Sequence, residues 1–349
     1  MNSTATAASS ASPLPILTSG DIAPECRLAD TNGAIVHLRA DSVAGCPLVL
    51  VFCPRLSTKS RELLNSFSQS LETISSSLGA RVFAVAGDWD GSIKVRFPIL
   101  LDPLWQAFAA FSAPRDCASI VILRRNYHLA AILTGSHETL LTDALSVLQK
   151  MTWEREAVSM RMHPPVLLVP DVLSSADCAH LMEIFETRGQ TYVDPQPIQD
   201  FLNGSDFKMR IPENGREDRI DHFFFEGETL SFLNSRLNRV WPEIFKAFHY
   251  PVTKCETLRV AKYQGRRGGT THGHRDNHPP THYRRFAMSI NLNTPEFEGG
   301  ELRFPEFGDQ RYRPDSGTAI VFSSSLLHEA LHVTKGRRYV LLAFLFGDT

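Results

Sequence analysis

Histidines in the C-terminal half of the chain have a spacing that could form a metal site. On an extended segment, side chains two residues apart point to the same side, so His274 and Asp276 could present an imidazole and a carboxylate together. A further imidazole, His328, follows a predicted strand over 318–322. Two histidines and one carboxylate leave coordination positions open, which suits Fe(II). Four neighbouring histidines are instead expected at a pocket rim or in solvent: His272, His278, His282 and His332.

An arginine ten residues after His328 could bind an acidic ligand near this site. Arg338 opens an apolar segment, 339–346, and an unpaired charge inside such a strand is costly. The planar guanidinium matches a carboxylate through two parallel hydrogen bonds, so a dicarboxylate is a fitting partner. Arg337 is the alternative, because residues that are adjacent in a strand face opposite sides of the sheet. Only one of the two can therefore point inward.

Short strands separated by Gly and Pro predict the architecture that must hold these residues. The expected strands of the C-terminal half cover 258–263, 286–293, 301–304, 318–322 and 339–346. Helices are predicted from Ser174 or Ser175 to about Thr187 and from Glu228 to about Phe248, with a long loop over 188–221 between them. Residues 298–301, Glu-Gly-Gly-Glu, are expected to form a hairpin turn. This pattern is typical of an antiparallel jelly roll.

The N-terminal half has a different pattern, in which strands and helices alternate. Strands are predicted over 34–38, 48–53, 81–86, 119–123 and 128–133, and helices over 57–78 and 137–150. Such alternation predicts an α/β domain with a central sheet covered by helices. We expect a disordered tail over 1–19, this first domain over 20–150, a linker over 151–163 and the second domain over 164–349.

Composition narrows the classes of function. The chain has 349 residues and a formal net charge of −2, which gives it no overall basic footprint for nucleic acid. Its 6 cysteines are scattered without a disulfide framework, and its apolar runs fall short of the ~20 residues of a membrane helix. The Ser-, Thr- and Ala-rich N-terminus resembles no targeting signal. We therefore expect a cytoplasmic protein with no membrane partner.

Residues 164–349 resemble the prolyl 4-hydroxylase-like Fe(II)/2-oxoglutarate dioxygenases, whose fold is a double-stranded β-helix. The motifs that carry the resemblance are Tyr263, His274-Arg275-Asp276, Phe297-Glu298-Gly299-Gly300-Glu301-Leu302, Pro314-Asp315-Ser316-Gly317, His328-Glu329 and Val333-Thr334-Lys335-Gly336-Arg337-Arg338-Tyr339. The resemblance implies that His274, Asp276 and His328 bind Fe2+. It also implies that Arg338 holds the distal carboxylate of 2-oxoglutarate, with Tyr263 and Asn291 facing this cosubstrate. The implied reaction uses O2, converts 2-oxoglutarate to succinate and hydroxylates a substrate, with ascorbate as a reductant.

Residues 20–150 resemble the thioredoxin-fold peroxiredoxins in Gly20-Asp21-Ile22-Ala23-Pro24, Leu28, Gly33, Leu48–Pro54 and Phe97–Pro103. Thr58 matches that family's threonine, and Arg115 its supporting arginine. Arg61 stands where those peroxidases need their reactive cysteine, so Cys53 and Cys117 are the thiols left for such chemistry. A docking, substrate-presenting or homodimerising module is the expected role.

These observations lead to one main hypothesis and two alternatives. The main hypothesis is hydroxylation of an aliphatic C–H in a prolyl, amino-acid-like or other small-molecule or peptidyl substrate. Eight Lys or Arg against two acids over 254–285 leave open an anionic substrate. The alternatives are a thiol peroxidase acting through the first domain and a non-enzymatic adaptor with a relict metal site. The 188–221 loop, with the Asp221-His222-Phe223-Phe224-Phe225 run, is the candidate lid.

Overall fold

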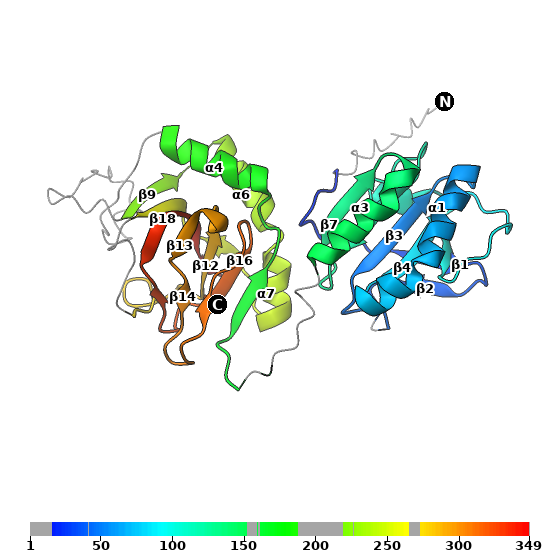
Figure 1. The fold of residues 1–349 in the computed structure, drawn as a ribbon. Coiled ribbons are helices and arrows are strands. Elements are labelled where there is room, and N and C mark those ends of the chain that lie inside the picture. The colour runs from blue at the N-terminus through cyan, green and yellow to red at the C-terminus, as the bar shows by residue number, and fades with distance from the viewer. Residues whose placement is uncertain are drawn as a thin grey trace, which may run out of the picture. The chain divides into compact units, whose positions relative to one another are not determined.

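The computed structural model describes residues 16–40, 42–151, 159, 161–187, 219–225, 227–264 and 273–348. The chain divides into two compact units, Met1–Ala157 and Val158–Thr349, and the division falls inside the predicted linker (Figure 1). The expected tail lies outside the described residues except for 16–19, where Leu17 packs against the core of the first unit. No helix of the described part of the chain is long and apolar enough to cross a membrane.

One seven-stranded sheet, in the order β2-β1-β5-β4-β3-β6-β7, forms the centre of the first unit. Its strands are β1 (Arg27–Asp30), β2 (Ile35–His37), β3 (Leu48–Cys53), β4 (Arg81–Ala86), β5 (Ile99–Leu101), β6 (Ser119–Leu123) and β7 (Leu129–Thr134). Strands β3, β4 and β5 are parallel, whereas β6 is antiparallel to both of its neighbours, β3 and β7. The short elements β1, β5 and α2 (Gln106–Ala110) were not predicted.

The side chains of β3 alternate between the two faces of the sheet, and both faces are covered. Val49, Val51 and Cys53 pack against α1 (Thr58–Gln69) and α3 (His137–Lys150). The residues between them pack on the other face, with Phe52 against Phe108 of α2. All six β3 residues are buried as a result, as expected for a central strand of an α/β sheet.

The predicted helix over 57–78 is interrupted rather than continuous. Helix α1 ends at Gln69, Ser70 forms a turn, and helical residues resume at Leu71 and lead into the π-helix η1 (Thr73–Ser77). In this second part the Ser75 hydroxyl donates to the Glu72 carbonyl over 3.5 Å, a local bond that competes with the regular helix. Ile74 still faces the core, which is why the spacing of apolar residues looked continuous.

Two sheets form the second unit. The larger has the order β8-β16-β12-β18-β11-β9, with β10 and β13 also paired to β18, and the smaller has the order β15-β14-β17. The larger contains β8 (Val166–Val169), β9 (Arg219–Phe224), β10 (Lys254–Cys255), β11 (Leu258–Gln264), β12 (Phe286–Asn291), β13 (Phe297–Gly299), β16 (Ala319–Ser323) and β18 (Val333–Phe346). The smaller contains β14 (Leu302–Arg303), β15 (Arg311–Tyr312) and β17 (Glu329–Ala330), and a 3-10 turn, η3 (Thr294–Glu296), precedes β13.

Helices cover one face of the large sheet and leave the other face for the site. Helix α4 (Ser175–Thr187), α6 (Glu228–Leu237) and α7 (Trp241–Phe248) share a core with alternate residues of β11, β12, β16 and β18. The predicted single helix over 228–248 is wrong, because the chain breaks at Asn238–Val240. Pro242 in the first turn of α7 lacks the N–H that a continuous helix would need.

Two predicted loops are also corrected. Residues 219–221 were placed in a loop, but they begin β9, which pairs with β11 along its whole length. Residues 188–218 of the candidate lid lie outside the described residues, and the Asp221–Phe224 part belongs to the sheet. The Glu298–Glu301 turn is not a hairpin, because β13 pairs with β18 in the large sheet while β14 belongs to the small one. Gly299 and Gly300, at φ +74° and +71°, let the chain cross between the sheets.

Candidate metal centre

The three predicted metal ligands meet at the side of the large sheet that the helices leave uncovered. His274 and His328 form an isolated antiparallel bridge, with two backbone hydrogen bonds of 3.0 Å between them. The His274 Nε2 atom lies 3.5 Å from Asp276 Oδ1, and the His328 Nε2 atom lies 3.4 Å from Asp276 Oδ2. One ligand atom from each residue lies within 4.8 Å of the others. Two imidazole nitrogens and one carboxylate at this spacing fit an Fe(II) site with open positions.

The surroundings of this cluster favour the protonation states that bind a metal. Burial lowers the pKa of His328, although the Asp276 charge opposes the shift. Burial tends to raise the pKa of Asp276, but the hydrogen bond from His274 and the charges of His328, His274 and Arg284 outweigh it and lower the pKa overall. A neutral imidazole and an ionised carboxylate are the ligand forms that a metal requires.

Neighbouring groups fix the orientation of the ligands. The Nδ1 atom of His328 lies 3.1 Å from the Leu326 carbonyl oxygen, and its ring packs on Phe322 at 4.8 Å between centroids. The Asp276 amide donates to the Ser324 carbonyl over 2.9 Å. Its own carbonyl accepts from Thr281 Oγ1 over 2.7 Å. These contacts fix the His328 ring and the backbone that carries Asp276.

Arg338 lies on the same side of the sheet, buried on β18. Only 4% of Arg338 is exposed, whereas Arg337 is exposed, so the two neighbours face opposite sides of the strand as alternation requires. The Arg338 Nε atom donates to Asn291 Oδ1 over 2.9 Å, and its guanidinium carbon lies 5.5 Å from the centre of the Tyr263 ring. The three residues predicted to face a cosubstrate are thus brought together, and Ser289, 3.5 Å from Arg338 Nη2, joins them.

The other histidines do not join the metal cluster among the described residues. His278 and His282 are exposed, and His332 is half-buried. His272 lies outside the described residues.

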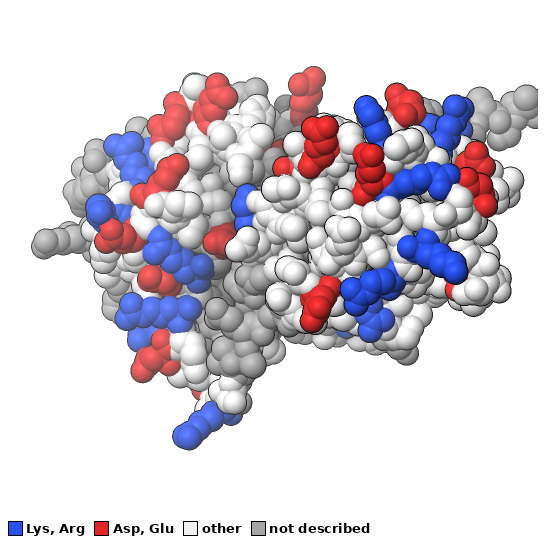
Figure 2. Space-filling model, turned by 45° about the vertical axis from the view of Figure 1, so that its right-hand side comes forward, with Lys and Arg blue, Asp and Glu red and all other residues white. Residues whose placement is uncertain are grey.

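Most of the basic surplus over 254–285 is paired in space with acids from other segments. Four of the eight cations form ion pairs in this way: Lys254 with Asp348, Arg259 with Asp221, Lys262 with Glu186 and Arg275 with Glu306. A fifth, Arg284, pairs with Glu256 of the same segment. Figure 2 shows that charges of both signs are interspersed on the face it displays. The surplus seen in the sequence therefore gives little support to an anionic substrate.

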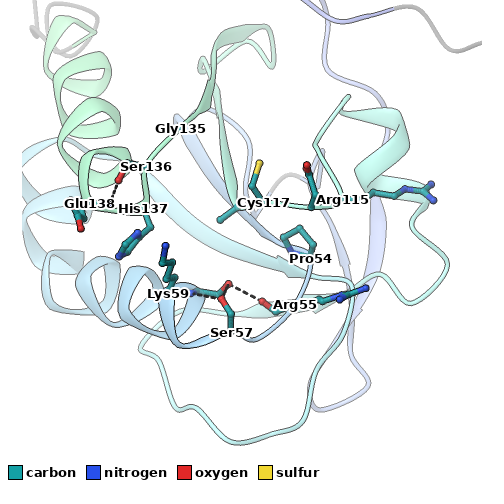
Figure 3. Close-up of a pocket in the computed structure, with 13 residues that line it drawn as sticks. Pro54, Arg55, Ser57, Lys59, Arg115, Cys117, Gly135, Ser136, His137 and Glu138 are labelled. Carbon is teal, nitrogen blue, oxygen red and sulfur yellow. Dashed lines mark hydrogen bonds between the residues drawn. The ribbon is translucent and has the colours of Figure 1, made fainter.

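A cavity of about 720 Å³ in the first unit lies where α1 and α3 begin (Figure 3). Lys59, His137 and Cys117 line it, while the Arg115 side chain points away. Burial and the neighbouring Asp116 charge raise the pKa of the Cys117 thiol. Burial raises the pKa of Cys53 to about 12. Because peroxide chemistry needs a thiolate, neither thiol favours the peroxidase alternative.

Comparison with known proteins agrees with the geometry of the second unit. Residues 258–346 match the model of the 2OG-Fe(II) oxygenase superfamily, and this range includes every residue of the metal cluster and of the Arg338 cluster. The second unit contains a 2OG-Fe(II) oxygenase domain. A PKHD-type hydroxylase of Alteromonas mediterranea is 39% identical to this chain over 61 residues, which are 17% of this chain and 27% of that protein.

The chain also resembles part of a longer protein. A multifunctional procollagen lysine hydroxylase and glycosyltransferase of Caenorhabditis elegans is 25% identical over 201 residues, 55% of this chain and 25% of that protein. The chain thus spans only about a quarter of the length of these curated relatives.

Solved structures similar to each unit exist as well. The viral collagen prolyl hydroxylase of Paramecium bursaria Chlorella virus-1 is 18% identical, with a TM-score of 0.37, over 53% of this chain and 96% of that one. The peroxidoxin BcpB of Mycobacterium tuberculosis is 17% identical, with a TM-score of 0.35, over 38% of this chain and 97% of that one.

Two features of the site were not predicted from the sequence. Ser289 joins the Arg338 cluster because β12 lies beside β18 in the sheet, an order that the sequence does not reveal. Glu306 reaches the segments of both histidine ligands from a turn after β14. No motif marks either residue.

Proposed function

We propose that the protein is an Fe(II)- and 2-oxoglutarate-dependent dioxygenase that hydroxylates an aliphatic C–H bond and converts 2-oxoglutarate to succinate. The observation that carries this proposal is the meeting of the three ligand atoms within 4.8 Å, inside the range matched by the oxygenase superfamily. His274, Asp276 and His328 would hold Fe2+, which supplies the activation of O2 when bound. Ascorbate is proposed as the reductant.

Arg338 would bind the distal carboxylate of 2-oxoglutarate. Its burial removes competing water, which strengthens a charge pair formed there. The hydrogen bond from Arg338 Nε to Asn291 fixes the plane of the guanidinium and so orients the group that would meet the carboxylate. The Tyr263 ring beside it limits the space in which the cosubstrate can lie.

The substrate is proposed to be a prolyl, amino-acid-like or other small-molecule or peptidyl compound. The hydroxylase names of the relatives support this class, and the carboxylate of Asp276 in the cluster supports hydroxylation as the reaction. We further propose a double-stranded β-helix for residues 164–349 and a peroxiredoxin-like module for docking, substrate presentation or homodimerisation over 20–150. A cytoplasmic location stays a prediction from the sequence.

Succinate release tests the reaction. Purified full-length protein with Fe(II), 2-oxoglutarate and O2 is expected to form succinate slowly even without the prime substrate, and the His274→Ala variant is expected to form none. Mass spectrometry of a host that expresses either protein should then find a product one oxygen atom heavier with the wild type alone. Equal succinate formation by both proteins, or none together with no bound iron, would favour the adaptor alternative.

A further inference from the structure

Glu306 connects the two segments that carry the proposed metal ligands. The residue lies in the turn that follows β14, outside both segments. Its Oε1 atom accepts from Arg275 Nη2 over 2.8 Å, and its Oε2 atom accepts from Arg275 Nη1 over 3.2 Å. Oε2 also accepts from the Leu327 amide over 3.1 Å. One carboxylate therefore contacts the residue between His274 and Asp276 and the residue just before His328.

Few backbone hydrogen bonds of the described residues join these two segments. His274 and His328 pair as a single bridge outside the named strands, and Asp276 adds one amide bond to Ser324. A short bridge can open locally far more easily than a continuous strand ladder. Arg275 adds to the connection, because its Nη1 atom also donates to the Ser325 carbonyl. Side chains therefore supply much of what holds the two segments at their spacing.

We propose that Glu306 is a positioning residue that sets the distance between the His274–Asp276 pair and His328, and so tunes metal affinity. The inference rests on the proposed function, because it assumes a metal at this cluster. Glu306 does not contact the ligand side chains in the described structure but acts through Arg275 and Leu327. Outer groups that orient metal ligands typically change metal affinity by about 10- to 100-fold when mutated.

Two substitutions at Glu306 should give graded effects. In Glu306→Gln an amide oxygen at the Oε2 position can still accept from Leu327 and from Arg275 Nη1, but the amide NH2 group then faces Arg275 Nη2, and the charge of the pair is lost, so the connection to Arg275 is weakened. Glu306→Ala removes the connections to both residues. We expect the Kd for Co(II), used as the metal probe, to rise about 10-fold in Glu306→Gln and further in Glu306→Ala. Glu298→Gln is the matched control, because it breaks only an exposed ion pair with Lys335.

Three measurements on the full-length protein separate the outcomes: Co(II) titration with absorption spectra, thermal unfolding, and hydrogen exchange of the metal-free protein. We expect the Glu306 variants to show a higher Kd for Co(II), an altered Co(II) spectrum and faster hydrogen exchange over 273–277 and 323–328. The control Glu298→Gln should behave like the wild type. If Glu306→Ala kept the wild-type Kd for Co(II) and the wild-type hydrogen exchange, the positioning role would be refuted while the proposed function would stand. If His328→Ala binds Co(II) as well as the wild type does, the proposed function fails, and this inference fails with it.

Discussion

Replacing Arg338 by alanine should separate binding of 2-oxoglutarate from binding of the metal. Arg338 is 4% exposed, and its contacts run to Asn291, Ser289 and Tyr263 rather than to the metal cluster. Truncating one partner of a desolvated charge pair costs about 2–5 kcal/mol. At about 1.4 kcal/mol for each factor of ten, the half-saturating concentration of 2-oxoglutarate should rise by ~30-fold or more.

The substitution will also lower stability, and the assay must allow for this. Asn291 is 3% exposed and would lose the Arg338 donor, at a cost of about 1–3 kcal/mol for an unsatisfied buried acceptor. Succinate formation is therefore measured against 2-oxoglutarate concentration well below the Tm of each variant, and the Kd for Co(II) is measured in parallel. Arg338→Lys keeps the charge but not the two-point geometry, so it should recover part of the affinity.

Arg337→Ala is the control, since this neighbour is exposed on the opposite side of the strand. It is expected to leave the 2-oxoglutarate requirement near that of the wild type. An unchanged requirement in Arg338→Ala, or a raised one in Arg337→Ala instead, would refute the assignment of the buried guanidinium to the cosubstrate.

Three further predictions concern the metal, the crossing between the sheets and the thiols. His274→Ala should abolish stoichiometric binding of Fe(II) in a metal analysis of anaerobically reconstituted protein, and retention of one equivalent would contradict its role as a ligand. Gly300→Ala should raise the 2-oxoglutarate requirement, because a Cβ atom there would lie 2.9 Å from Arg338 Cδ at a φ of +71°; the same succinate titration checks this, and an unchanged value would mean that Arg338 does not need this close packing. Substituting Cys53 and Cys117 by serine should leave the rate of peroxide consumption unchanged, and a thiol-dependent loss would restore the peroxidase alternative.

The elements that the sequence predicted well are those whose packing is local and regular. Strand β3 and helix α3 coincide with their predicted ranges, because each is a continuous apolar or periodic segment between clear stop signals. The errors came where a competing local effect was hidden by that periodicity, as with the serines after Gln69 and Pro242 in α7. Strand β9 was missed because its pairing partner, β11, is remote in sequence.

The residues of the candidate site likewise fall into those that local sequence patterns predict and those whose contacts depend on remote segments. His274 and Asp276 were predictable because their relation depends only on the two-residue period of an extended segment. Strand alternation showed that only one of Arg337 and Arg338 could point inward, whereas the choice of Arg338 came from the resemblance to the dioxygenase family; Arg338 is the buried one of the two. Glu306 could not be predicted, because its contacts depend on the path of a turn that lies 31 residues from Arg275.

The two halves of the proposed site are supported in different ways, and this should govern how each responds to mutation. Arg338 lies within β18, a strand that pairs with β11 and β12 along most of its length, so its position is fixed by many backbone hydrogen bonds. The metal ligands lie on a single bridge and its flanking loops, held by side chains such as Arg275 and Glu306. Single substitutions around the metal should therefore shift its geometry and affinity in graded steps. Substitutions beside Arg338 should instead leave the strand in place and act only through the side chain that is changed.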